Sequence, residues 1–246
     1  MIDSVAPPGW GSRPASVLEA TDVVKEFRGG DGGMLRVLDG VNLDVARGEM
    51  VAIVGASGAG KSTLLHVLGA LERPTRGEVR LSGEPIGRLG DEELAGVRNR
   101  AVGFVFQFHH LLREFSALEN VSIPLRIAGA DAGSARDRAA ALLERMGLAA
   151  RMHHRPGQLS GGEQQRTAVA RALATDPAVL LADEPSGNLD HANAERLHDL
   201  FAELARDLEL GLVVVTHNRS LAQRADRALL LEDGRLVATD VNEVVT

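Results

Sequence analysis

Two short segments of this sequence carry residues suited to phosphate chemistry. The first, GASGAGKST over residues 55–63, contains the spacing G-x-x-x-x-G-K-[ST], in which glycines let backbone N–H groups approach a phosphate. In such a loop Lys61 would hold the β- and γ-phosphates and the Ser62 hydroxyl would hold Mg²⁺. The predicted nucleotide-binding residues of the loop are Gly55, Ala56, Ser57, Gly58, Ala59, Gly60, Lys61, Ser62 and Thr63.

The second segment, AVLLADEP over residues 178–185, is an apolar strand that ends in two carboxylates. Asp183 could hold Mg²⁺ through water, while Glu184 polarises the attacking water, as phosphoryl transfer to water requires. On its own an acidic pair after a strand is more often a solvated turn. The phosphate loop elsewhere in the chain favours the catalytic interpretation.

A second anion site is predicted in LSGGEQQR, residues 159–166. Ser160 and Glu163 have capping-box spacing, which by itself predicts only a well-capped helix. A serine followed by Gly161 and Gly162 at the positive end of a helix also suits a phosphate. A γ-phosphate that is bound at the helix after the phosphate loop does not need a second helix N-terminus from the same chain. Ser160, Gly161 and Gly162 are therefore predicted to face the nucleotide of a second copy.

An α/β fold is needed to position these segments. Strands are predicted at residues 17–27, 35–45 and 50–54, and leucines at 64, 65, 68 and 71 predict a helix that Arg73-Pro74 stops. Residues 129–173, rich in Ala, Arg, Leu and Glu, predict helices, with Ser134 as an N-cap. Strands are predicted again at 178–183, 212–216 and 228–232, and the turn Asp233-Gly234 leads into one more.

Composition excludes several classes of protein. With 246 residues, 44% hydrophobic, the chain is expected to form one domain with a sizeable core. Its net charge of −7 is unlike that of a typical nucleic-acid binder, and the lack of cysteine excludes disulfides and thiol catalysis. No apolar run approaches the ~18 residues of a membrane span. Residues 1–15 lack the features of a signal peptide and are predicted to form a flexible leader.

In this order, the phosphate loop, LSGGE, LLADEP and VVVTH resemble the nucleotide-binding subunit of an ABC transporter. The resemblance implies a P-loop NTPase fold, with a RecA-like α/β core, an antiparallel β subdomain and an inserted α-helical subdomain. It places the ATP-binding domain at 16–246 and the helical subdomain at about 108–166. It also implies ATP and Mg²⁺ as cofactors, and a dimer of two copies that encloses ATP between them.

The resemblance also assigns roles by position. Gln107 matches a glutamine that senses Mg²⁺ and the γ-phosphate, Glu184 matches the general base, and His217 matches a histidine that contacts the γ-phosphate. Asp190 belongs to the D-loop, SGNLD, and Phe27 lies where the family usually has a tyrosine that stacks on adenine. Ser62, Gln107 and Asp183 are thereby implied as the Mg²⁺ ligands.

The other histidines, His198 among them, are expected to be ordinary surface or packed residues, and no transition metal is expected.

After Gln107, the stretch QFHHLLREFSALENVSIPL is similar to the ATPases of lipoprotein-releasing systems, the LolD family, although Arg113 replaces a common proline. Phe108, Leu111, Leu112 and Phe115 would form an apolar docking site for LolC/LolE-type membrane subunits.

The resemblance implies a peripheral ATPase on the cytoplasmic face of the cell inner membrane. This ATPase would power the release of lipoproteins towards the outer membrane and would handle these substrates only indirectly. MacB-like efflux and FtsE-like cell-division ATPases are the alternatives. No nucleic-acid partner is expected, because neither a long coiled coil nor a second ATPase unit is present.

Overall fold

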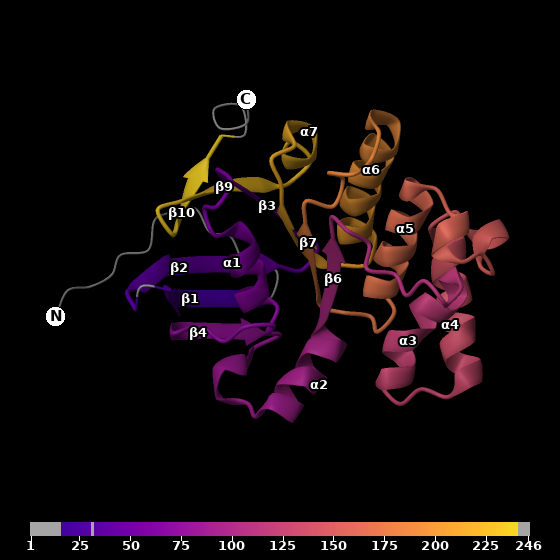
Figure 1. Ribbon diagram of the computed structural model, residues 1–246, viewed down its shortest axis with the longest axis horizontal. Helices are drawn as coiled ribbons and strands as arrows, with labels where there is room; N and C mark the ends of the chain where they lie inside the picture. The colour runs from indigo at the N-terminus through magenta and orange to yellow at the C-terminus, as the bar shows by residue number, and fades with distance from the viewer. Residues whose placement is uncertain (1–15, 31, 241–246) are drawn as a thin grey trace.

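The computed structural model describes residues 16–30 and 32–240, so the predicted leader lies outside the described residues. An antiparallel sheet occupies the N-terminal part of the fold (Figure 1, left). Its order is β2-β1-β4-β5, and its strands are β1 (Ser16–Arg28), β2 (Met34–Ala46), β4 (Arg76–Leu81) and β5 (Glu84–Pro85). The first two segments confirm the strands predicted at 17–27 and 35–45.

A six-stranded sheet of order β10-β9-β3-β8-β7-β6 forms the centre of the molecule. All neighbouring strands are parallel except β9 and β10, which form a hairpin. Its strands are β3 (Met50–Val54), β6 (Val102–Phe106), β7 (Val179–Asp183), β8 (Gly211–Val215), β9 (Arg227–Glu232) and β10 (Arg235–Thr239). The carboxyl ends of β3, β8, β7 and β6 therefore lie side by side at one edge of the sheet.

Two hydrophobic cores lie on the two faces of this sheet. On β3, Val51 and Ile53 join one core and Ala52 and Val54 join the other, because successive side chains of a strand point to opposite faces. The first core lies against the antiparallel sheet, α1 (Lys61–Leu68) and α2 (Asp91–Ala101). Burial on both faces explains why the sequence of these strands is apolar throughout rather than alternating.

Helices cover the second face. They are α3 (Ala117–Ile127), α4 (Ala132–Arg145), α5 (Gly161–Ala172), α6 (His191–Asp207) and α7 (Arg219–Ala222). The first three group at the end of the molecule farthest from the antiparallel sheet (Figure 1, right). Short 3-10 turns occur at Ile86–Arg88, Ala149–Arg151 and Pro156–Gln158. In the described part of the chain, no helix combines the length and the apolar character that crossing a bilayer requires.

Two local predictions were wrong. The N-cap of α4 is Asp131, whose carboxylate accepts hydrogen bonds from the backbone N–H groups of Gly133 and Ser134, so Ser134 lies inside the helix. The helix after the phosphate loop ends at Leu68 rather than near Arg73, because Gly69 is its C-cap and Ala70 adopts a left-handed backbone with φ of 59°.

Candidate active site

The loop between β3 and α1 requires glycine at two positions. Gly55 has φ of +154°, and a Cβ there would lie 2.5 Å from the carbonyl oxygen of Leu231. Gly60 has φ of +98°, and a Cβ there would lie 2.7 Å from Cγ1 of Val37. A larger residue at either position would push the loop away from β2 or β9, so these glycines fix the shape of the loop.

The N-terminus of α1 is suited to an anion. Side chains accept hydrogen bonds at the N-terminus of every other α-helix in the described residues, whereas α1 begins at Gly60 with neither a side-chain cap nor an acidic first turn. The first N–H groups of a helix have no intrahelical acceptor, and the helix dipole makes that end positive. Lys61 lies over the loop, its ammonium donating to the carbonyls of Gly55 and Ala56 at 2.8 and 2.9 Å. These features fit the phosphates of a nucleotide.

A cavity of about 670 Å³ adjoins this loop, a volume within the range of small-molecule sites. Residues 56–59 of the loop form one wall, Leu35, Arg36 and Val37 of β2 form another, and residues 230–234 of the β9–β10 hairpin complete it. Phe27 pairs with Leu35 in the register of β1 and β2, so it lies next to a residue that lines the cavity.

The Phe27 ring is 37% exposed, and the Lys25 ammonium lies 4.9 Å from its centroid. Lys25 also pairs with Glu72 at 2.9 Å, so the cation is fixed in place. A ring held in this way keeps an exposed aromatic surface at the edge of the cavity, as adenine stacking requires.

We expect Phe27→Ala to raise the KM for ATP by about 5- to 30-fold, because stacking of a base on an aromatic ring contributes roughly 1–2 kcal/mol. Phe27→Tyr, which keeps the ring, should retain the parental KM. Steady-state kinetics with varied ATP measures both variants. A Phe27→Ala protein with unchanged KM would show that the ring does not contact the base.

The catalytic residues predicted from the sequence follow neighbouring strands. Phe106 of β6, Asp183 of β7 and Val215 of β8 lie opposite one another in the parallel register. Gln107 and Glu184 come directly after two of these strands, and His217 follows the third by one further residue. In open parallel sheets this edge is where ligands bind. The structure thus brings these side chains to the same edge as the phosphate loop, which follows β3.

Both oxygens of the Glu184 carboxylate are held by the loop after β8. Oε1 lies 2.9 Å from Nδ1 of His217, and Oε2 accepts from the backbone N–H of His217 and the hydroxyl of Thr216, each at 3.3 Å. A carboxylate only accepts hydrogen bonds, so we assign the ring proton to Nδ1. Thr216 was not singled out from the sequence, although it lies beside His217 in the motif.

The backbone of Glu184 is left-handed, with φ of 44°. For a residue with a Cβ this conformation costs on the order of 1–2 kcal/mol, and it persists only where the surroundings hold it. The N–H of Glu184 donates to the carbonyl of Val215 at 2.9 Å, which fixes this residue to the end of β8.

Gln107 is joined to the loop after β7. Its Nε2 donates to Oδ1 of Asn188 at 3.2 Å, and Nδ2 of Asn188 donates back to the Gln107 carbonyl at 3.0 Å. A Cβ at Gly187 would lie 2.9 Å from Nε2 of Gln107, so a larger residue there would shift the Gln107 side chain. The sequence places Asn188 in the D-loop motif but gives no sign that it binds Gln107.

The predicted residues Ser160, Gly161, Gly162 and Asp190 form a second group, at the N-termini of α5 and α6. A Cβ at Gly162 would lie 2.7 Å from Oδ1 of Asn193, whose Nδ2 donates to the Asp190 carboxylate at 2.6 Å. In Figure 1, α5 and α1 lie on opposite sides of β6 and β7. The structure therefore does not bring this group to the phosphate loop of the same chain.

Hydrogen bonds keep two carboxylates of this group ionised. The backbone N–H of Ser160 donates to Glu163 at 2.8 Å and lowers the pKa of that carboxyl. The backbone N–H of Asn193 likewise lowers the pKa of Asp190. The Ser160 hydroxyl accepts from the Glu163 N–H at 3.3 Å, which confirms the predicted capping box.

Comparisons with known proteins agree with this geometry. The ABC transporter family profile matches residues 38–187. The lipoprotein-releasing system ATP-binding protein LolD of Geobacter metallireducens is 54% identical over 224 residues, covering 91% of this chain and 99% of the relative. LolD of Pseudomonas fluorescens is 49% identical over 223 residues, covering 91% and 98%.

Among solved structures, the dimeric ATP-binding cassette MJ0796, in a post-hydrolysis state with ADP and Pi, has a TM-score of 0.81. It is 38% identical, and the match covers 89% of this chain and 96% of that one. The cassette cbiO1 from Clostridium perfringens has a TM-score of 0.79 at 26% identity, covering 90% and 87%. These likenesses confirm the fold class predicted from the sequence.

Proposed function

Because this chain belongs to the ABC transporter ATPase family, we propose that it is the ATP-hydrolysing subunit of a complex that releases lipoproteins from a membrane. The observation that carries the proposal is the 54% identity to a lipoprotein-releasing ATPase over 99% of that protein. The site supports the ATPase chemistry, since the phosphate loop and the Glu184–His217 pair lie at one edge of the sheet. MacB-like efflux and FtsE-like division ATPases would share that chemistry.

In the proposed mechanism, the loop before α1 and Lys61 bind the phosphates of ATP, and Phe27 binds the base. Ser62, Asp183 and Gln107 offer the oxygen ligands that Mg²⁺ prefers, and the ion would neutralise charge on the β- and γ-phosphates. Glu184 takes a proton from water as the water oxygen bonds to the γ-phosphorus and the bond to the ADP oxygen breaks. His217 and Thr216 hold the carboxylate that receives this proton.

We propose that two copies enclose two ATP molecules, each bound by the phosphate loop of one copy and by Ser160, Gly161 and Gly162 of the other. The separation of these two groups within one chain supports this arrangement, and the similar cassette MJ0796 is dimeric. Asp190 would lie beside the same interface. The proposed ATP-binding domain is residues 16–246, with its helical subdomain at about 108–166.

We propose that the segment after Gln107 docks LolC/LolE-type membrane subunits at the cytoplasmic face of the inner membrane. Phe108, Leu112 and Phe115 expose 66%, 47% and 41% of their surface, and Leu111 is half-buried. Exposed apolar side chains grouped in this way favour a protein partner.

The segment is tied to α5, the helix that begins beside Ser160. Nδ1 of His109 bonds to Oε1 of Gln165, and Arg171 donates to the carbonyls of His109 and His110 at 2.9 and 2.7 Å. A partner that moves this segment would therefore move α5 as well.

Purification of the tagged protein from native membranes tests the proposal. We expect membrane subunits with large periplasmic domains and lipid-modified proteins to co-purify, as identified by mass spectrometry. Recovery of an efflux adaptor or a division-site membrane protein would contradict the lipoprotein role and leave the ATPase mechanism in place.

We expect Phe108→Ser to reduce recovery of these membrane subunits at least tenfold, because burial of one phenylalanine contributes roughly 1.5–3 kcal/mol. Val237→Ser, at a 51% exposed residue of β10, is the matched control and should recover them at the parental level. The melting temperature of both variants checks that they are folded. Equal recovery with both variants would place the docking site elsewhere.

A further inference from the structure

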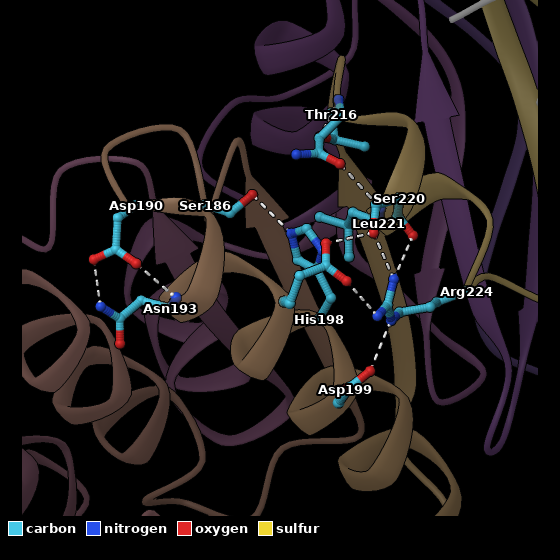
Figure 2. A network of polar contacts seen from close by, with 11 residues as sticks. Ser186, Asp190, Asn193, His198, Asp199, Thr216, Ser220, Leu221 and Arg224 are labelled. Carbon is cyan, nitrogen blue, oxygen red and sulfur yellow. Dashed lines mark hydrogen bonds and ion pairs between the residues drawn. The ribbon is translucent and has the colours of Figure 1, made fainter.

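A network of polar contacts joins the loop after β7 to α6 and α7 (Figure 2). Ser186, two residues after Glu184, is 7% exposed, and its hydroxyl lies 2.9 Å from Nε2 of His198 on α6. The His198 side chain is fully buried, which agrees with the predicted surface or packed helix residue, but nothing in the sequence indicated its polar partner. The loop that carries Glu184 is thus joined to α6 by a side-chain contact in the protein interior.

The same network continues from α6 to α7. Glu195, one turn before His198, accepts from the hydroxyl of Ser220 at 2.6 Å and pairs with Arg224 at 2.7 Å. Arg224 also pairs with Asp199 at 2.9 Å. Because α7 begins two residues after His217, these bonds hold the loop that carries His217 against α6.

Charge around the ring determines where its proton lies. Burial lowers the pKa of His198, so the ring is neutral and carries one N–H. The Ser220 hydroxyl and Arg224 hold the pKa of Glu195 at about 2, so that this residue is a carboxylate. Its Oε1 lies 3.5 Å from Nδ1 of His198, an electrostatic contact rather than a hydrogen bond, and the negative charge favours the proton on Nδ1. Nε2 is then an acceptor, and the Ser186 hydroxyl donates to it.

We propose that His198 is a positioning residue for ATP hydrolysis, which holds the Glu184 loop against the His217 loop through Ser186 on one side and Glu195 with Ser220 on the other. This inference rests on the ATPase mechanism proposed above. Glu184 needs such support because its left-handed backbone is costly. The bond to Val215 holds Glu184 at its own N–H, and the Ser186–His198 contact holds the chain just beyond it.

Kinetics of His198→Met, His198→Gln and Ser186→Ala tests this role. Methionine fills the space without a nitrogen, whereas the glutamine amide can replace Nε2 of the ring. We expect His198→Met and Ser186→Ala each to lower kcat about 5- to 20-fold with unchanged KM for ATP, since a buried hydrogen bond contributes roughly 1–2 kcal/mol. His198→Gln should recover most of kcat, and combining His198→Met with Ser186→Ala should cause no further loss.

Hydrogen exchange of the nucleotide-free protein tests the link itself. His198→Met should accelerate exchange in residues 185–190 and in residues 217–222. Ser122→Ala, which removes a hydroxyl bond to the Leu118 carbonyl on α3, is the control and should change neither segment. Faster exchange in only one segment, or parental kcat in both His198→Met and Ser186→Ala, would overturn the inference. If His198→Met does not fold, the kcat of Ser186→Ala decides whether the inference holds. An inactive parental protein would contradict the ATPase mechanism instead, and the exchange result would still decide the link.

Discussion

Glu184→Gln is expected to lower ATP turnover by about 10²- to 10⁴-fold, the usual contribution of a general base. Glutamine has the same shape, and its amide oxygen can still accept from Thr216 or from the His217 N–H, so the loop after β7 should keep its position. What is lost is the ability to take a proton from water. ATP binding should persist, because the phosphate loop is unchanged. ATP-bound dimers should therefore accumulate.

Single-turnover hydrolysis, equilibrium ATP binding and sedimentation in ATP measure these three effects. Glu203→Gln, at an exposed carboxylate of α6, is the control for loss of a negative charge and should hydrolyse ATP normally. Parental turnover by Glu184→Gln would remove Glu184 from the role of base. Loss of ATP binding would instead show that the substitution disturbs the phosphate loop.

Mixing two inactive variants is expected to restore ATP hydrolysis. Lys61→Ala removes the ammonium over the phosphate loop, and Ser160→Arg places a long side chain at the N-terminus of α5. Each homodimer has two defective sites. In a mixed dimer both defects fall in one site, and the other site combines an intact loop with an intact Ser160. Random mixing produces about half mixed dimers with one good site each, so about a quarter of parental activity should return.

Native mass spectrometry in ATP verifies that mixed dimers form, and ATPase assays before and after mixing give the recovery. Ser160→Arg also removes a helix cap that contributes about 1 kcal/mol, so its melting temperature is compared with that of Ser160→Ala, which lacks the same cap. If mixed dimers form and ATPase activity stays at background, either each site is built from a single chain, or each site hydrolyses ATP only when the other site of the dimer is intact. Either explanation would contradict two independent sites that are each shared between the two copies.

Local sequence signals predicted the central strands well, because β3, β7 and β8 are short apolar segments bounded by glycine or polar turns. They were less reliable at helix ends. Asp131 rather than Ser134 caps α4, since both residues suit a cap and only the backbone path decides between them. The end of α1 depends on the left-handed Ala70, which sequence does not reveal. Helix α3 lies within the helical subdomain implied at about 108–166, but local signals did not identify it, although Ser116 and Glu119 have the capping-box spacing that marks its start.

Motif spacing predicted the residues of the phosphate loop, Asp183, Glu184 and the group at Ser160, and the resemblance to ABC transporter subunits added Phe27, Gln107, Asp190 and His217. Neither predicted the partners that these side chains contact. The contacts of Gln107 with Asn188, of Glu184 with Thr216 and of His198 with Ser186 join segments that are distant in sequence or belong to different loops. Whether such residues meet depends on strand order and register. A pattern that predicts each strand separately does not predict which strand lies beside it.

The burial of both faces of the central sheet has a consequence for folding errors. A one-residue slip normally exposes a strand's apolar side, which makes the error costly. In β3, where all five residues are buried, a slip would exchange one set of apolar side chains for another. Its alignment depends on polar anchors such as the Asp226 carboxylate, which accepts from the Met50 N–H at 2.8 Å, and the Ile53 carbonyl, which accepts from Thr216. A misaligned chain could thus be compact and protease-resistant yet inactive, so correct folding of this enzyme is better judged by turnover than by solubility.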